Sequence, residues 1–199
     1  MLTTLAHKLE KAAENVPFIK TERLMLRPFT FQDAHDIFEY ARDELTALYT
    51  TFSPHKSLED SYYFLYEIVL PSYERGDLGP LALDLNGKVI GAIELRTIPS
   101  PIRHHTREMG IILNLHYRSK GYIHEAGKAL IKYAFSQPGI YRLFGCVEMD
   151  NHASVKALEK LGFSYEGKEI HGRILKSHYV DLLHYSLLKK DWSKKDSKQ

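Results

Sequence analysis

The chain contains a single cysteine and carries almost no net charge. Among 199 residues only Cys146 is a cysteine, so a disulfide framework within the chain is excluded, which fits a reducing compartment. The formal net charge of +2 gives no basis for predicting nucleic-acid or membrane partners. We therefore expect a cytoplasmic protein that binds neither.

Long apolar runs and nucleotide-binding glycine motifs are also missing. No apolar run approaches the ~20 residues needed to span a bilayer, and we expect no cleavable signal peptide. No complete Gly-x-x-x-x-Gly-Lys-Ser/Thr or Gly-x-Gly-x-x-Gly sequence occurs, so we discount a nucleotide phosphate-binding protein. The 11 histidines lack the spacing of metal ligands and have no set of cysteines beside them, so we predict no metal site.

The length and composition fit one globular domain. Hydrophobic residues make up 44% of the chain and charged residues 26%, which allows a substantial core. Apolar residues such as Leu5, Leu9 and Val16 share one helical face, so residues 1–18 are predicted to form an extra amphipathic helix on the domain or on a partner subunit. Residues 192–199 are expected to be a basic, solvated tail, which leaves 19–191 as the domain.

Turn and cap signals divide the domain into strands and helices. Asn86-Gly87 between two apolar runs predicts a hairpin over 81–95, because both central residues of a type I′ turn need positive φ. Later helices are predicted over 122–135 and 154–161. The remaining strands are expected at 23–28, 108–113, 141–147, 164–170 and 178–188, and the remaining helices at 30–40 and 58–73. This order predicts a mixed sheet flanked by helices, in the α+β class.

A short basic segment joins the strand at 108–113 to the helix that begins at Tyr122. A helix N-terminus carries unpaired N–H groups and a partial positive charge, which suit a phosphate. Arg118 and Lys120 add charge, and Gly121 lets the backbone approach a ligand closely. Taken alone, the segment fits either a pyrophosphate site or an ordinary solvated turn.

The segment also carries a family resemblance. The sequence RSKGYI at 118–123 resembles the Arg/Gln-x-x-Gly-x-Gly/Ala motif of the GNAT superfamily of N-acetyltransferases, and departs from it at Ile123. Residues 108–111 are similar to the family's fourth strand. Residues 150–163 resemble its Asn-x-x-Ser helix, which ends in Leu-Gly-Phe.

Two further segments resemble the RimJ/RimL branch, the ribosomal-protein N-terminal acetyltransferases and their relatives. These are Thr-Glu-Arg-Leu at 21–24 and Tyr-Ser-Leu-Leu at 185–188. The resemblance covers about residues 20 to 190. It implies a GNAT-type, mostly antiparallel central sheet flanked by helices, to which the N-terminal helix is an addition.

The resemblance further implies acetyl-CoA as cosubstrate and direct transfer of its acetyl group to a primary amine. Two neighbouring strands would splay at Leu113, where free backbone N–H groups bind the pantetheine arm and polarise the acetyl carbonyl. The cofactor-binding residues implied in this way are Ile112, Leu113, Leu115, Arg118, Ser119, Lys120, Gly121, Tyr122, Ile123, Asn151 and Ser154.

Catalysis needs a group that removes a proton from the amine. A peptide α-amine has a pKa of roughly 7.7–8.0, so a carboxylate acting through water is enough. Glu108 is the first candidate for this base and Glu94 the second. Strand alternation places Glu108, Gly110 and Ile112 on one face.

The thiolate leaving group needs a proton donor. Ser154 matches the position of the family's general acid, and it also fits a plain helix-start residue. Tyr185 and Tyr179 are the alternatives. The residues expected to be catalytic are therefore Glu108, Asn151 and Ser154, while Cys146 is expected to be a buried, inert thiol.

The sequence leaves the acceptor open. It fits a protein N-terminal α-amine, a small amine such as a polyamine, amino sugar or antibiotic, or no acceptor at all in a CoA-binding sensing module. A cationic small acceptor should leave an acidic groove, and a peptide acceptor should leave an open, neutral one. Both a monomer and a homodimer are compatible with the sequence.

Overall fold

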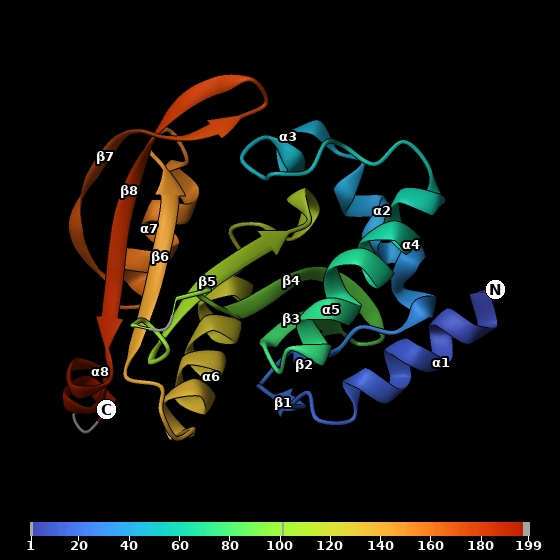
Figure 1. Cartoon of the computed structure of the whole chain (residues 1–199), viewed down its shortest axis with the longest axis horizontal. Helices are drawn as coiled ribbons and strands as arrows, with labels where there is room; N and C mark the ends of the chain where they lie inside the picture. The colour runs from blue at the N-terminus through green and yellow to red at the C-terminus, as the bar shows by residue number, and fades with distance from the viewer. Residues whose placement is uncertain (1, 101, 197–199) are drawn as a thin grey trace.

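A central mixed sheet organises the computed structural model, which describes residues 2–100 and 102–196; Met1 and residues 197–199 of the expected tail lie outside it. In the described residues the sheet has eight strands in the order β1-β2-β3-β4-β5-β6-β8-β7 (Figure 1). The strands are β1 (Ile19–Lys20), β2 (Met25–Pro28), β3 (Leu78–Leu85), β4 (Lys88–Thr97), β5 (Thr106–Leu113), β6 (Arg142–Glu148), β7 (Ser164–Leu175) and β8 (His178–Leu188). Every neighbouring pair is antiparallel except β5 with β6, so the expected α+β class is confirmed.

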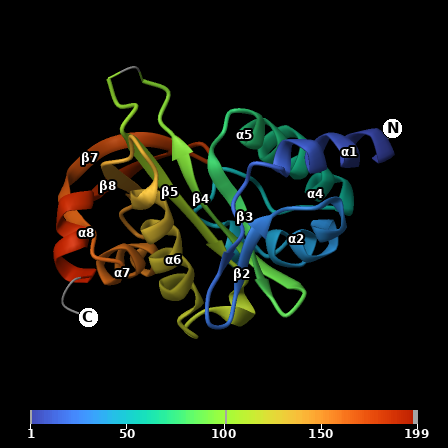
Figure 2. The same ribbon diagram turned by 90° about the horizontal axis from the view of Figure 1, so that it is seen from below.

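Helices cover both faces of this sheet. The helices are α1 (Leu2–Ala13), α2 (Ala34–Ala41), α3 (Glu44–Ala47), α4 (Leu58–Phe64), α5 (Leu70–Glu74), α6 (Tyr122–Ser136), α7 (His152–Lys160) and α8 (Lys189–Asp196). Short 3-10 turns occupy Phe31–Asp33 and Leu115–Tyr117, and a π-helical stretch, Leu65–Val69, joins α4 to α5. Helices α2, α4 and α5 lie on one face, and α6 and α7 lie on the other (Figure 2).

Local sequence signals account for the turns that set these elements. Asn86 and Gly87 adopt φ values of 54° and 87°, as the predicted hairpin between β3 and β4 requires. Gly162, with φ of 91°, follows α7, and the Phe163 N–H donates to the Leu158 carbonyl at 3.0 Å. This bond closes a Schellman-type end that only a left-handed residue permits without strain.

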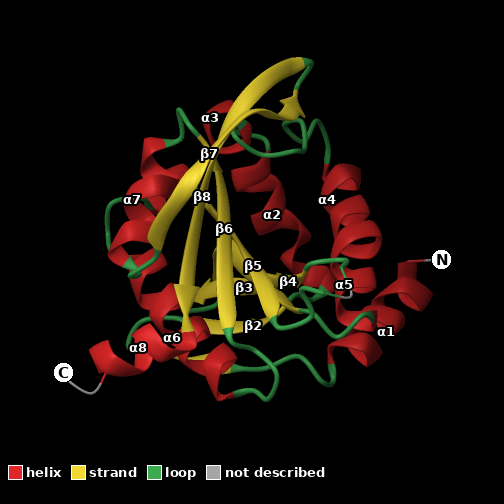
Figure 3. Ribbon diagram, turned by 60° about the vertical axis from the view of Figure 1, so that its left-hand side comes forward, coloured by secondary structure: helices red, strands yellow, loops and turns green. Residues whose placement is uncertain are grey.

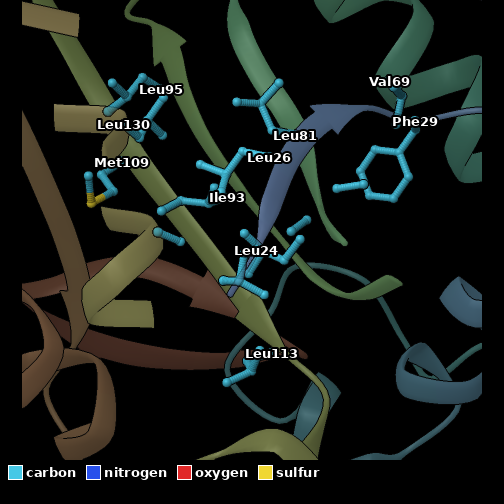
Figure 4. Packing of buried hydrophobic residues seen from close by; sticks show 14 of the residues in the cluster. Leu24, Leu26, Phe29, Val69, Leu81, Ile93, Leu95, Met109, Leu113 and Leu130 are labelled. Carbon is cyan, nitrogen blue, oxygen red and sulfur yellow. The ribbon is translucent and has the colours of Figure 1, made fainter. Parts of the chain in front are cut away.

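One hydrophobic cluster runs through the sheet and the helices that flank it. Leu26, Ile93 and Leu130 have no exposed surface, and Figure 4 shows part of the cluster around β2 to β5. Burying each side chain of this size stabilises the fold by about 1.5–3 kcal/mol. The core therefore fixes the position of β5, from which the functional site is built.

The parallel pairing of β5 with β6 is short. It runs from Thr106 opposite Arg142 to Glu108 opposite Phe144 and then ends. Beyond this point β5 stays paired with β4 and β6 stays paired with β8, so the two strands diverge (Figures 1 and 3). The separation thus begins well before Leu113, where the sequence placed it, because each strand follows its antiparallel neighbour.

The two ends of the chain pack against the domain. Helix α1 ends at Ala13 and lies against α5 and the π-helical stretch, with Leu9 only 2% exposed. At the other end, α8 crosses the expected boundary at residue 192, and Trp192 packs partly buried against the core. Residue 192 therefore belongs to the packed domain rather than to a free tail, because its indole buries apolar surface. Within residues 2–100 and 102–196, no helix has the length and apolarity to span a membrane.

Helix α1 should contribute to the stability of the fold through Leu9. Replacing Leu9 with Ala removes a buried side chain from the face that contacts the domain, and we expect the free energy of unfolding to fall by about 2–5 kcal/mol. Urea unfolding of Leu9→Ala beside the exposed Lys8→Ala measures this. Equal stability of the two variants would contradict an integrated helix.

Candidate active site

The diverging edge of β5 presents backbone groups that no strand pairs. The carbonyl of His105 accepts hydrogen bonds from the N–H groups of Tyr141 (3.1 Å) and Arg142 (3.3 Å), so odd-numbered residues of β5 turn their backbone groups toward β6. The Asn114 N–H donates to the Ile90 carbonyl at 2.8 Å, which turns even-numbered residues toward β4.

This alternation identifies the backbone groups that face the opening. Past Glu108 they belong to Met109, Ile111 and Leu113, which have no partner strand on that side in the described residues. Leu113 therefore lies where the sequence placed it. Ile112 turns its backbone toward Ala92 of β4 instead, and the sequence analysis missed Met109 and Ile111. The alternation of backbone direction between odd and even residues of the strand could have identified these two residues.

The loop before α6 has the conformation of an anion-binding turn. Ser119 and Gly121 have positive φ values of 63° and 83°. The first backbone hydrogen bond of α6 joins the Glu125 N–H to the Gly121 carbonyl at 3.1 Å, so the N–H groups of residues 122–124 have no acceptor within the helix. Ile123 packs its side chain against the hydrophobic core, which leaves its N–H free.

The two cations of this loop point in different directions. The Arg118 Nε donates to the Leu113 carbonyl at 3.3 Å, and its Nη2 donates to the Thr46 hydroxyl of α3 at 3.4 Å. Lys120 lies with its Nζ 5.2 Å from the centre of the Tyr117 ring. Arg118 is thus directed at the end of β5 and at α3, rather than at the start of α6 as the sequence suggested.

Asn151 and Ser154 meet at the start of α7. The Asn151 Oδ1 accepts the Ser154 N–H at 3.2 Å and caps the helix. Both residues line a cleft of about 310 Å³ that opens between β5 and β6, below α4 and the β7–β8 hairpin. The two alternative acids lie elsewhere: the buried Tyr185 donates to Glu159 at 3.2 Å, and Tyr179 is 68% exposed and stacks on His171.

The cleft carries three carboxylates and two arginines. These residues are Glu94, Arg96, Glu108, Glu148 and Arg173. Arg96 contacts Glu108 at 3.1 Å and Glu94 at 3.5 Å, so it serves both carboxylates. The sequence analysis named two of the carboxylates and neither arginine.

Glu94 lies above Gly110 of the neighbouring strand. A β-carbon on Gly110 would come within 2.6 Å of the Glu94 Oε1, so only glycine leaves room for this carboxylate. Burial raises the pKa of Glu94 above its ordinary value, and Asp77 and Glu108 add to this rise against the opposing effect of Arg96. Gly110, which the Glu94 side chain covers, precedes Ile111, whose backbone faces the opening.

Glu148 is a cleft residue that the sequence analysis missed. Its Oε2 is buried and has no hydrogen-bond partner in the part of the chain that the structure describes. Burial raises the pKa of this carboxyl, and Asp150 raises it further. Cys146, two residues earlier on the same face of β6, is half-buried beside Arg173, and burial raises the pKa of its thiol, as expected for an unreactive group.

The rim of the cleft is tied together by two polar bridges. The Lys176 Nζ, in the turn of the β7–β8 hairpin, donates to the Ala47 carbonyl of α3 at 2.8 Å (Figure 3). The Tyr49 hydroxyl donates to the Asp150 carbonyl at 3.2 Å. Residues 49–52, which follow α3, thus line the cleft together with Gly110.

These features together fit a ligand with a diphosphate at one end and amide groups along its arm. The start of α6 offers N–H groups to an anion, and the open edge of β5 offers strand-like backbone pairing. The charged cleft lies next to that edge. Acetyl-CoA has this construction, with a thioester beyond its amides.

Comparisons with known proteins agree with this geometry. Residues 23–164 match the family model described as "Acetyltransferase (GNAT) domain". The chain is 26% identical over 178 residues to "Uncharacterized N-acetyltransferase YnaD" of Bacillus subtilis, covering 88% of the chain and 99% of that protein. It is 31% identical over 145 residues to "Putative ribosomal N-acetyltransferase YdaF" of the same organism, covering 71% of the chain and 76% of that protein. Identity to the spermidine N(1)-acetyltransferase of Escherichia coli is 30% over 97 residues, about half of each chain.

Solved structures share the fold. A GNAT-family acetyltransferase from Bacillus anthracis superposes with a TM-score of 0.76 at 27% identity, covering 87% of this chain and 99% of that one. The RimL ribosomal L7/L12 α-N-protein acetyltransferase, solved with CoA, gives a TM-score of 0.74 at 18% identity, covering 86% and 98% of the two chains. The chain belongs to the GNAT family of acetyltransferases, and it is an N-acetyltransferase with acetyl-CoA as its cosubstrate and an amine as its acceptor.

Proposed function

We propose that the protein acetylates the α-amine of a protein or peptide N-terminus, as a RimJ/RimL-like member of its family. The observation that carries this proposal is the charge balance of the cleft. Arg96 and Arg173 offset most of the charge of Glu94, Glu108 and Glu148. A polyamine site needs carboxylates without such partners, whereas a peptide end needs an open cleft with one group to accept its proton. The match to YdaF also spans more of the chain than the match to the spermidine enzyme.

The residues that would hold acetyl-CoA follow from the backbone geometry. The N–H groups of residues 122–124, at the start of α6, lie at the end of the helix where an anion gains from the helix dipole. Ile111 and Leu113 would pair with the amides of the pantetheine arm, and Asn151 would contribute its side-chain amide. Acetyl-CoA supplies the acetyl group in activated form, as a thioester.

Glu94 is our proposed general base. Its raised pKa makes the carboxylate a better proton acceptor than an ordinary glutamate, and Gly110 leaves it next to the backbone of Ile111. Glu108, the first candidate from the sequence, is held by Arg96 at 3.1 Å, so its carboxylate is already engaged by a guanidinium. Glu94 would accept the proton of the incoming amine, directly or through one water.

The backbone and α7 would complete the reaction. The Ile111 N–H, free of any partner strand, would stabilise negative charge that develops on the acetyl oxygen. Ser154 lines the same cleft in the first turn of α7 and would donate a proton to the departing sulfur. Tyr185 and Tyr179 are less suited to this role, since neither lines the cleft.

Substitution of the two candidate bases separates their roles. We expect Glu94→Gln to lower kcat/KM by about 10²–10⁴-fold, the range for loss of a general base. Glu108→Gln should cost far less. Initial rates of thiol release between pH 6 and 9 measure both variants, and the acid limb of the wild-type profile should disappear in Glu94→Gln. A larger loss in Glu108→Gln than in Glu94→Gln would overturn the assignment.

Glu94 should also make stability depend on pH. Because its pKa is raised in the folded protein, the folded state binds this proton more tightly than the unfolded state. The stabilisation is therefore complete below the ordinary carboxyl pKa of 4.5 and is lost as the pH rises through the folded pKa. Glu94→Gln should unfold at a higher denaturant concentration than wild type at pH 7, with the difference vanishing near pH 4. Glu108→Gln, whose carboxylate has an arginine partner, is the matched control and should show no such gain.

The acceptor class can be tested with a panel of amines. We expect thiol release from acetyl-CoA with N-terminal peptides and at least tenfold lower kcat/KM with spermidine or aminoglycosides. Asn151→Ala should reduce turnover on every acceptor. Preference for a polyamine would replace the peptide proposal, and CoA binding without thiol release on any amine would favour a sensing module.

A further inference from the structure

The tight turn that joins β1 to β2 contacts the start of α6. Within the turn the Thr21 N–H donates to the Leu24 carbonyl at 2.9 Å, and the Leu24 N–H donates to the Thr21 hydroxyl at 2.9 Å. These bonds fix residues 21–24 as a compact unit. The unit reaches a loop about a hundred residues later in the chain, so its contacts there are purely tertiary.

Glu125, in the first turn of α6, is the anchor of this contact. Its Oε1 accepts hydrogen bonds from the Thr21 hydroxyl (2.5 Å) and the Arg23 N–H (2.7 Å), and its Oε2 accepts the Arg23 Nε at 2.7 Å. Burial alone would raise the pKa of Glu125, but these hydrogen bonds outweigh it and lower the pKa. The carboxylate is therefore charged at neutral pH and holds Arg23 in one orientation.

Arg23 lies across the loop itself. Its Nη1 donates to the Lys120 carbonyl at 3.0 Å, and its guanidinium lies 4.5 Å from the centre of the Tyr122 ring. Its Nη2 has no acceptor among the described residues and lies over Gly121, where a β-carbon would come within 3.4 Å of it. One donor edge of the guanidinium is thus left facing the loop.

The orientation of Arg118 makes this edge more important. The Nε and Nη2 groups of Arg118 donate to the Leu113 carbonyl and to the Thr46 hydroxyl, which directs this guanidinium toward the end of β5 and α3. Lys120 is the other cation of the loop. Arg23 therefore places a second positive charge beside the N–H groups of residues 122–124, although Arg23 lies outside the 118–123 motif.

We propose that Arg23 binds the diphosphate of acetyl-CoA through its free Nη2 and holds the 118–123 loop in its binding conformation through Glu125 and Lys120. The inference rests on the proposed function only in taking this loop as the diphosphate site. A guanidinium fixed on one edge by a carboxylate and open on the other is preorganised for a phosphate. Glu125 is the positioning residue in this arrangement, because it acts on the ligand through Arg23.

Binding measurements with CoA and with pantetheine test the proposal, because pantetheine lacks the diphosphate. Isothermal titration of the full chain gives Kd for both ligands with wild type, Arg23→Ala and Arg23→Lys. Arg142→Ala is the matched control, since Arg142 also pairs with a glutamate, Glu166, at 2.6 Å. Thermal unfolding of each variant establishes that it is folded.

We expect Arg23→Ala to weaken CoA binding by about tenfold or more, which is the loss of one charge-assisted contact. The Kd for pantetheine should stay within about twofold, and Arg23→Lys should restore part of the CoA affinity because it keeps the charge without the fork. In turnover, the KM for acetyl-CoA should rise while kcat at saturation is maintained. Arg142→Ala should leave both Kd values unchanged.

Other outcomes would overturn the proposal. Equal weakening of CoA and pantetheine in Arg23→Ala would assign Arg23 a structural role alone, and unchanged CoA affinity would remove it from the site. If wild type binds CoA no more tightly than pantetheine, the loop is not the diphosphate site and the inference fails with it. None of these results depends on the acceptor, so an error in the acceptor proposal is detected separately.

Discussion

The end of pairing between β5 and β6 is the constraint on which the site depends. These strands form the one parallel pair in the described sheet, and their pairing stops at Glu108 and Phe144. An unpaired backbone edge is normally a cost, because its N–H and C=O groups need partners. Here the hydrophobic core and the outer antiparallel pairs hold the edge open, with its backbone groups facing the cleft.

The charged groups of the cleft are arranged around the same edge. Gly110 lets Glu94 lie over β5, and Arg96 from the neighbouring position on β4 contacts both Glu94 and Glu108. The two carboxylates therefore differ in environment although they share an arginine. One is buried with a raised pKa, and the other is the closer ion-pair partner.

Segments that are distant in sequence complete the site from its sides. The turn at residues 21–24 braces the loop before α6, and the β7–β8 hairpin contacts α3 through Lys176. The N-terminal part of the chain thus contacts both the loop before α6 and the rim of the cleft. These contacts are charge-assisted hydrogen bonds, which are stronger than hydrogen bonds between neutral groups.

The sequence by itself determined the features that depend on neighbours along the chain. The Asn86-Gly87 hairpin and the Gly121 loop before α6 follow from local backbone geometry, as does the order of strands and helices that defines the α+β class.

Tertiary structure alone decided which side chains meet. Packing directed Arg118 toward α3 and brought Arg23 to the loop before α6. It also placed Glu148 in the cleft and left Tyr185 outside the cleft, where it donates to Glu159. The physical reason is that a motif fixes where a side chain starts, whereas its partners depend on packing between elements that are tens of residues apart in the chain. Periodicity and turn chemistry act over a few residues and carry no information about those distances.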